Sequence, residues 1–351
     1  MGELALSPVG LLLAAAMSVV NVLTDVARKH ALHKRDLIPA TFWMRVAVAL
    51  IFMVVLAVRV LRGAAVTIRD AGPLFGIARL HPAPVPTFLI YLVLDVGLIT
   101  CVMWLYFRAL QVSPLSLCVP FLSFTPVFLI PSGFVMLGEL PSAVKLLGVL
   151  LIVIGSLAMH RRLFAVSWMA PVRAILEEKG SRYMLTVSFL FSITNPLDKK
   201  LVLMSDVFTE SVAYGLGLVL AFFLLGKAQH ADFGAAIRRN VKWVALAGLF
   251  DAVSLLFQLA SYAYISVVIT VSIKRAGIIL SVLAGWLFFR EREITDKVIA
   301  ASVMFCGVLI LYLPLTAVEA VAVTVLTLAG MALALYLTRV EAAEPVAARS
   351  S

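Results

Sequence analysis

The sequence predicts an all-α integral membrane protein: a 5+5 inverted-repeat bundle of transmembrane helices followed by an eleventh helix. Three observations lead to this expectation. The 351 residues are 63% hydrophobic and only 14% charged, whereas soluble domains are about 45–50% apolar and about 25% charged. The apolar residues fall in long runs, and a helix needs about 20 such residues to cross a bilayer. Finally, segments of the two halves resemble each other, which is the mark of an internal repeat.

Hydropathy divides the chain into eleven expected spans. They are Pro8–Ala27, Ile38–Val58, Pro86–Phe107, Leu115–Leu137, Ala143–His160, Met184–Met204, Val207–Leu225, Trp243–Tyr262, Ser266–Phe289, Val298–Leu315 and Ala320–Leu337. None of the connections is long enough to hold a soluble domain. We therefore expect a multi-pass protein of the cell or inner membrane whose function lies within the bilayer.

The internal similarity has a definite register. Placing Glu139 on Glu291 also places Gly133 on Gly285. In the first span polar residues at i, i+3 and i+7 recur at the same spacing in the sixth. These residues are Asn21, Thr24 and Arg28, then Ser192, Asn195 and Lys199. The repeat unit is thus five spans long.

A unit with an odd number of spans reverses its orientation when it is repeated, as in secondary transporters that bind substrate between inverted halves. We expect the first repeat over residues 8–163, a connecting loop over 164–182 and the second repeat over 183–315. An extra transmembrane helix and a short tail occupy 316–351.

Two segments carry a family resemblance. PFLSFTPVFLIPSGFVMLGELP in the first half and IKRAGIILSVLAGWLFFRERE in the second resemble the EamA family of the drug/metabolite transporter superfamily. The resemblance extends from about Leu11 to Leu315, so the last span is additional to the usual ten. It implies a carrier that moves small organic solutes by alternating access.

Five ionisable residues inside expected spans are the most informative: Arg45, Asp95, Asp251, Lys274 and Arg275. Three of them, Asp95, Asp251 and Lys274, are eight or nine residues from a span end, about 12–14 Å deep at a rise of 1.5 Å per residue. A charge at the centre of the bilayer costs at least about 2.5–3.5 kcal/mol. These side chains are therefore expected to face the interior of the bundle.

Two interpretations of the buried charges remain open. In one, the acids pair with the cations and lock the helices together. In the other, the cations bind an anionic substrate group, and Asp95 or Asp251 carries a proton or balances the empty site. Asn21, Asn195 and Gln258 would add hydrogen bonds in this second interpretation.

The pair Lys274-Arg275 resembles the Lys-Arg pair in the ninth helix of triose-phosphate translocators, which belong to the same superfamily. That resemblance implies an anionic substrate. The chemistry agrees, because the planar fork of arginine and the point charge of lysine both suit phosphate and carboxylate groups.

The sequence also limits the functional class. It lacks the HExxH, GxSxG and GxxxxGK[ST] motifs, and its three cysteines have no metal-ligand spacing. We therefore expect no enzyme, no cofactor, no metal and no nucleic-acid partner. The expected function is a secondary transporter of a small polar metabolite, with protons as a candidate coupling ion. A flippase for a lipid-linked or amphipathic substrate and a non-transporting membrane scaffold or sensor are the alternatives.

The distribution of cations predicts an orientation. Of the 29 lysines and arginines, nineteen lie on one side of the expected spans and seven on the other. The positive-inside rule places the richer side in the cytoplasm, and with it the C-terminus. The family resemblance implies instead that the N-terminus lies inside.

Overall fold

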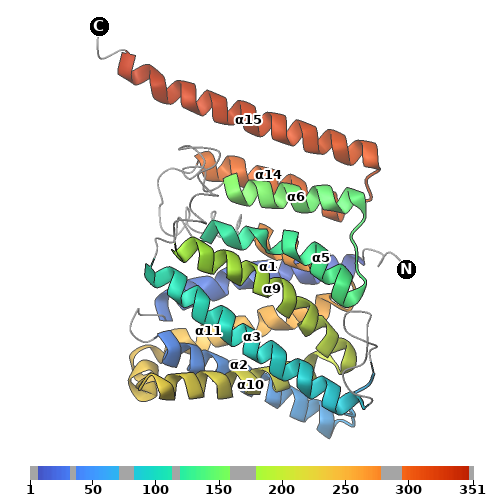
Figure 1. Cartoon of the computed structure of the whole chain (residues 1–351), viewed down its shortest axis with the longest axis vertical. Helices are drawn as coiled ribbons and strands as arrows, with labels where there is room; N and C mark the ends of the chain where they lie inside the picture. The colour runs from blue at the N-terminus through green and yellow to red at the C-terminus, as the bar shows by residue number, and fades with distance from the viewer. Residues whose placement is uncertain are drawn as a thin grey trace.

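The computed structural model describes residues 7–31, 37–70, 83–112, 119–158, 179–277 and 295–347. Within these ranges the secondary structure is helical, and the helices run roughly side by side (Figure 1). They are α1 (Pro8–Ala31), α2 (Leu37–Leu61), α3 (Pro84–Val112), η2 (Val119–Phe124), α5 (Thr125–Leu137), α6 (Ala143–Ala158), α9 (Lys179–Met204), α10 (Val207–Ala228), α11 (Phe233–Ser261), α12 (Val267–Ala276), α14 (Thr295–Tyr312) and α15 (Ala317–Ala347). The predicted all-α bundle is confirmed.

Within the part of the chain that the structure describes, six helical segments are long and apolar enough to cross a membrane. They are Pro8–Arg28, Leu37–Leu61, Pro84–Tyr106, Val207–Ala228, Asn240–Ser261 and Ala317–Ala334. Helix α9 has 26 residues, about 39 Å of helix, but it carries too many charges to count as apolar. Its polar side chains from Ser188 to Lys200 are buried. The multi-pass membrane protein expected from the sequence is confirmed.

The fourth expected span, Leu115–Leu137, differs from a simple helix. Its described part begins as the 3₁₀ segment η2 and becomes α-helical only at Thr125. Pro126 lies in the first turn of α5, where its missing N–H removes no helical hydrogen bond. Three expected features lie outside the described residues. They are the part of the ninth expected span after Gly277, the residue Glu291, and the expected end of the first repeat at residue 163.

The helices pair across the two halves of the sequence. Helix α1 packs on α11, and α3 packs on α9. Likewise α2 packs on α10, α5 on α12 and α6 on α14. In the two expected repeats, α1 corresponds to α9, α2 to α10, α3 to α11, α5 to α12 and α6 to α14. Replacing each helix by its counterpart turns the α1–α11 pair into the α9–α3 pair. The other three pairs are left unchanged. The bundle is therefore interleaved, with the two halves sharing one interior.

Among the described glycines, Gly148 on α6 and Gly307 on α14 come closest to the backbone of the other half. A Cβ atom on Gly148 would lie 2.8 Å from the carbonyl oxygen of Gly307, and one on Gly307 would lie 2.7 Å from the oxygen of Gly148. Small residues allow membrane helices to approach this closely. Glycine is therefore required on both helices.

Helix α9 continues through Pro196 without ending. Proline has no N–H, so the carbonyl of Ser192 loses its partner four residues on. The hydroxyl of Ser132 on α5 replaces that partner and donates to the Ser192 oxygen at 2.7 Å. A contact between the two halves thus compensates for the proline.

Helix α15 lies at the edge of the bundle, beyond α6 and α14 (Figure 1). Apolar side chains such as Val318 and Leu326 are exposed on it. Such a surface is suited to contact with lipid. The eleventh helix expected from the sequence is therefore present, and it is placed away from the polar interior.

Candidate functional site

A polar interior lies where the helices of the two halves meet. Buried charged side chains come from α2, α3, α9 and α10. They are Arg45, Asp95, Asp198, Lys199, Lys200 and Glu210. Lys274 and Arg275, on α12, are half-buried. Five helices thus contribute charge to one interior.

Four side chains form a continuous hydrogen-bonded network, which we call the Lys274 network. The ammonium of Lys274 donates to Gln258 Oε1 on α11 at 2.7 Å. Gln258 Nε2 donates to the hydroxyl of Tyr262 at 2.8 Å, and that hydroxyl donates to Asn195 Oδ1 on α9 at 3.1 Å. Gln258, Tyr262 and Asn195 are buried. The structure therefore brings Lys274, Gln258 and Asn195 together, as the sequence analysis expected of site residues.

A second group pairs Asp251 with two arginines. Arg28 Nη2 on α1 lies 2.7 Å from Asp251 Oδ1, and Arg45 Nη1 on α2 lies 2.8 Å from Oδ2. The side chains of Arg45 and Asp251 are 10% and 16% exposed. This ion pair joins three helices and both halves of the chain. For Arg45 and Asp251 this agrees with the interpretation in which buried acids pair with cations and lock the helices together.

Arg275 points to the other side of α12 from Lys274. Its Nη2 donates to Thr125 Oγ1 on α5 at 3.2 Å, and its guanidinium lies 5.8 Å from the centre of the Phe191 ring. Thr125 in turn lies 2.9 Å from the hydroxyl of Ser188 on α9. Adjacent in sequence, Lys274 and Arg275 thus contact different helices.

Asp95 lies among acids rather than beside a cation. Within the described part of the chain, no amide, hydroxyl or cationic group donates to either of its carboxyl oxygens. The carboxyl groups of Asp198 on α9 and Glu210 on α10 lie close enough to interact with it. Asp95 is fully buried and Glu210 nearly so.

Asn21 lies one turn beyond Ser18 on α1. The hydroxyl of Ser18 donates to the carbonyl of Ile273 on α12 at 2.9 Å, so this face of α1 meets α12 next to Lys274. Asn21 is half-buried. It is therefore near the Lys274 network without a hydrogen bond to it.

One end of the interior is closed by an ion pair. Lys199 Nζ on α9 lies 2.5 Å from Glu139 Oε1, which follows α5, and both side chains are buried. Lys199 also donates to the carbonyl of Ile265 at 3.1 Å, while Glu139 Oε2 accepts from the amide of Val267 at 3.2 Å. Glu139 therefore pairs with Lys199 and caps the start of α12.

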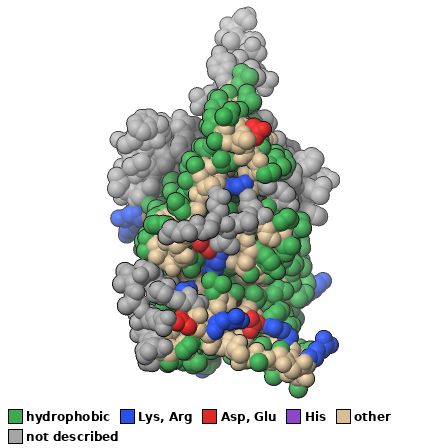
Figure 2. Space-filling model, turned by 90° about the vertical axis from the view of Figure 1, so that its right-hand side faces the viewer, with side chains coloured by type: hydrophobic (Ala, Val, Ile, Leu, Met, Phe, Trp, Pro, Cys, Tyr) green, Lys and Arg blue, Asp and Glu red, His purple; other side chains and the backbone are tan. Residues whose placement is uncertain are grey.

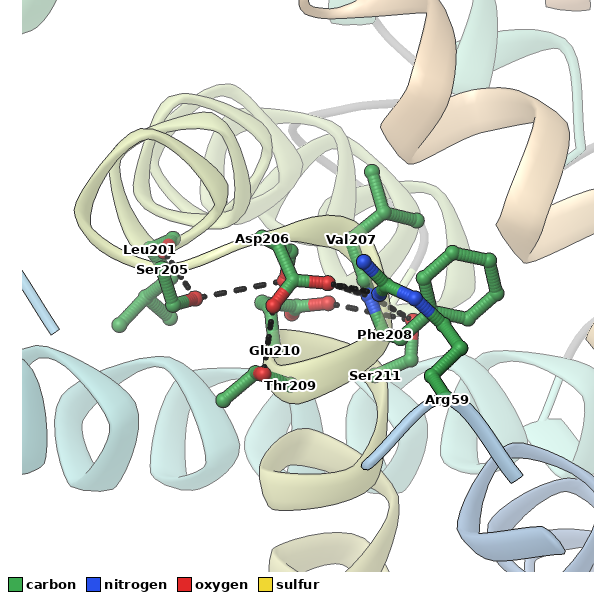
Figure 3. Close-up of polar contacts among 9 residues, drawn as sticks. All are labelled: Arg59, Leu201, Ser205, Asp206, Val207, Phe208, Thr209, Glu210 and Ser211. Atoms are coloured by element: carbon green, nitrogen blue, oxygen red, sulfur yellow. Dashed lines mark hydrogen bonds and ion pairs between the residues drawn. The ribbon is translucent and has the colours of Figure 1, made fainter. Parts of the chain in front are cut away.

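At this end of the bundle, basic and acidic side chains lie among hydrophobic ones (Figure 2). It carries a more exposed ion pair (Figure 3). Arg59 Nη1 lies 2.7 Å from Asp206 Oδ1, and Asp206 caps α10 by accepting from the amide of Phe208. Burial acts to raise the pKa of Asp206, but hydrogen bonds from Thr209, Arg59 and Phe208, and the charge of Arg59, together hold it below its ordinary value. Asp206 is thus an ionised cap at the edge of the bundle.

Asp198 and Glu210 were not predicted as site residues from the sequence. The roles of Tyr262 in the Lys274 network and of Arg28 as a partner of Asp251 were not predicted either. Asp198 and Glu210 lie near the ends of expected spans, where acids are usually hydrated. The available signal was the spacing of Asn195 and Asp198, since residues three apart share a helix face. The distant partners of Arg28 and Tyr262 left no signal in the local pattern.

This combination defines a class of protein: a multi-pass membrane protein with an interleaved helical bundle and a buried polar interior, which is the architecture of a membrane transporter. Residues 8–160 match the EamA-like transporter family. The resemblance noted in the sequence is therefore confirmed over residues 8–160. No curated protein matches the sequence.

The fold also has a counterpart among solved structures. A structure titled "Crystal structure of protein" aligns with a TM-score of 0.61 and 15% sequence identity. The alignment covers 86% of this chain and 96% of the other. At this identity the similarity establishes the shared fold alone.

Proposed function

We propose that the chain is a secondary transporter that moves a small polar organic solute with a phosphate or carboxylate group by alternating access. The observation that carries the proposal is the Lys274 network. It places one ammonium and three neutral hydrogen-bonding side chains in the membrane interior, where an unused polar group is costly. Side chains retained there at that cost are expected to serve binding.

Lys274 suits a reversible anion site. An ammonium has three donors in a rotatable arrangement, so an anionic oxygen can replace Gln258 Oε1 as its acceptor. Gln258, Tyr262 and Asn195 would then bond to the polar remainder of the solute. Asp198 and Asp251 lie close enough to interact with Lys274 and would balance its charge when the site is empty. Competition with these acids would keep anion binding weak enough for release.

The divergence of Lys274 and Arg275 links binding to helix movement. Lys274 holds α12 to α11 and Arg275 holds it to α5. A solute that takes over either contact changes the interactions of α12 with one neighbour and not the other. Such a differential interaction is what allows a ligand to shift a conformational equilibrium.

The two buried ion pairs would set the states of the cycle. Glu139 with Lys199 closes one end of the interior, while Asp251 with Arg28 and Arg45 joins α11 to α1 and α2. Opening either side requires separating helices that these pairs hold. We therefore assign Asp251 and Arg45 to gating, and Asn21 to a supporting position beside α12.

Uptake into proteoliposomes tests the proposal. The probes are inorganic phosphate, glycerol phosphate, succinate, neutral glycerol and a quaternary ammonium compound, each measured as counterflow against the same solute trapped inside. We expect saturable exchange of a phosphate or carboxylate probe and none in protein-free vesicles. Exchange of the cation alone would overturn the proposed charge preference. Translocation of a labelled lipid without exchange of any soluble probe would favour the flippase.

A further inference from the structure

Asp95 is fully buried, and among the described residues neither of its carboxyl oxygens has a hydrogen-bond partner. Helix α3 packs on α9, and the buried carboxyl of Asp198 on α9 lies close enough to interact with Asp95. A carboxylate is an acceptor only, so a hydrogen bond between two carboxyl groups requires a proton on one of them. A proton shared by the two groups would supply the hydrogen that Asp95 lacks.

Titratable and charged groups from several helices surround the pair. Glu210 and Tyr214 on α10 and Tyr262 on α11 lie in interaction range of both acids. Lys274 of α12 interacts with Asp198, and Arg45 of α2 with Tyr214. One cation therefore faces Asp198, and Asp95 is left with acids and phenols.

Other ligands fit this cluster less well. Among the described residues, no three acidic, histidine or cysteine side chains are arranged to hold one metal ion. Asp251, by contrast with Asp95, has both oxygens occupied by arginines. A proton is the cation that a pair of buried carboxyl groups binds without further ligands, and chains of such acids carry protons in membrane pumps.

We propose that Asp95 and Asp198, with Glu210 beside them, form a proton-binding site that is loaded from one side of the membrane and emptied to the other. This assignment rests on the transporter function proposed above. Asp198 also interacts with Lys274 of the solute network. Removing the proton leaves an additional negative charge next to that lysine, which disfavours an anionic solute. Proton and anion would therefore travel together.

Infrared spectroscopy of the full-length protein in lipid tests the site without any solute. The measured signal is the carbonyl stretch of protonated carboxyl groups. We expect it to decrease reversibly as the pH is raised, and to lose the intensity of one carboxyl in Asp95→Asn and in Asp198→Asn. The new amide can donate to the remaining carboxylate, so no proton is needed. Asp232→Asn, at the exposed cap of α11, should leave the signal unchanged.

Folding of each variant is checked by monodisperse elution, and the titration of the wild-type protein provides a measurement that needs no variant. A band that does not respond to pH, or that keeps its full intensity in folded Asp95→Asn and Asp198→Asn, would overturn the assignment.

Transport separates this inference from the function on which it rests. With the panel probe that exchanges, Asp95→Asn should lose accumulation driven by a pH gradient, whereas Asp232→Asn should keep both accumulation and counterflow. Gradient-driven accumulation that persists in Asp95→Asn would contradict the proton site. Absence of exchange for every probe would refute the proposed function, while the infrared titration would still decide whether the carboxyl pair binds a proton.

Discussion

At Asp251 the structure favours ion pairing over direct substrate contact. Both carboxylate oxygens are occupied, one by Arg28 and one by Arg45. A pair of this kind matters mainly when one partner is removed, because the remaining charges are then buried without compensation. Stability therefore provides the test of its role.

We expect Asp251→Asn to destabilise the protein by about 3 kcal/mol, the low end of the range for broken buried pairs, because Arg28 is partly exposed. Arg45→Met should cost less, since Asp251 keeps its bond to Arg28. Chemical unfolding in detergent measures both. Equal stability of Asp251→Asn and the wild type would show that the pair is unimportant to the fold.

Asp206 gives a pH dependence whose sign follows from its pKa. The pKa of this carboxyl is below its ordinary value in the folded protein, so the ionised form stabilises the fold. That contribution is complete above the unfolded pKa of about 3.9 and is lost as the pH falls through the folded value. Asp206→Asn retains a good helix cap and removes the titration.

The measurement is the melting temperature of wild type and Asp206→Asn at a series of pH values below about 5, near where unfolded carboxyls begin to titrate. The difference between the two proteins should shrink on acidification. A difference that stays constant with pH would mean that Asp206 is not held ionised by Arg59 and its cap.

At the scale of the helices, the glycine contact between α6 and α14 is the most demanding feature. A Cβ on Gly148 meets backbone, 2.8 Å from the oxygen of Gly307, so the helices themselves must move. We expect Gly148→Ala to cost about 1–3 kcal/mol, as overpacking does. Gly97→Ala on α3 is the matched control, because a Cβ there has nothing within 4 Å.

Thermal unfolding of the two variants in the same detergent makes the comparison. Gly97→Ala should be at least as stable as the wild type, because alanine is the better helix former. If Gly148→Ala melted at the same temperature as Gly97→Ala, the close approach of α6 and α14 would be wrong.

Most helices could be predicted because hydropathy reports long apolar runs directly. For helix α9, hydropathy does not predict which polar residues are buried. Its stretch from Asn195 to Lys200 is polar and near the end of the expected span, yet all six residues are buried. A hydropathy window treats such residues as interfacial, whereas packing of α3 on α9 encloses them. Of the proposed proton-binding pair, therefore, only Asp95 on α3 was predictable from the sequence.

Partners across the sequence were also beyond local patterns. Arg28 and Asp251 are separated by 223 positions, and Lys199 and Glu139 come from different halves of the chain. Helical periodicity assigns each side chain to a face, but it does not say which helix covers that face. The interleaved pairing of the halves supplies this information.

For the whole molecule, burial changes the charge count that predicts orientation. Arg28 pairs inside the bundle, and Lys199 and Lys200 are buried. Without these three, the cations number eighteen on one side and five on the other. The bias persists, so we expect the C-terminus in the cytoplasm. A reporter fused after Ser351 should be active there, and an extracytoplasmic signal would reverse the assignment.

The central claim is that Lys274 binds the transported solute, and counterflow in proteoliposomes tests it most directly. Losing a hydrogen bond to a charged group costs about 1.5–3 kcal/mol, which corresponds to about a tenfold or greater loss of affinity. We predict that Lys274→Gln lowers exchange of the transported anion by at least that factor at low solute concentration. Lys242→Gln, at an exposed position on α11, should exchange normally. Undiminished exchange by folded Lys274→Gln would contradict the account.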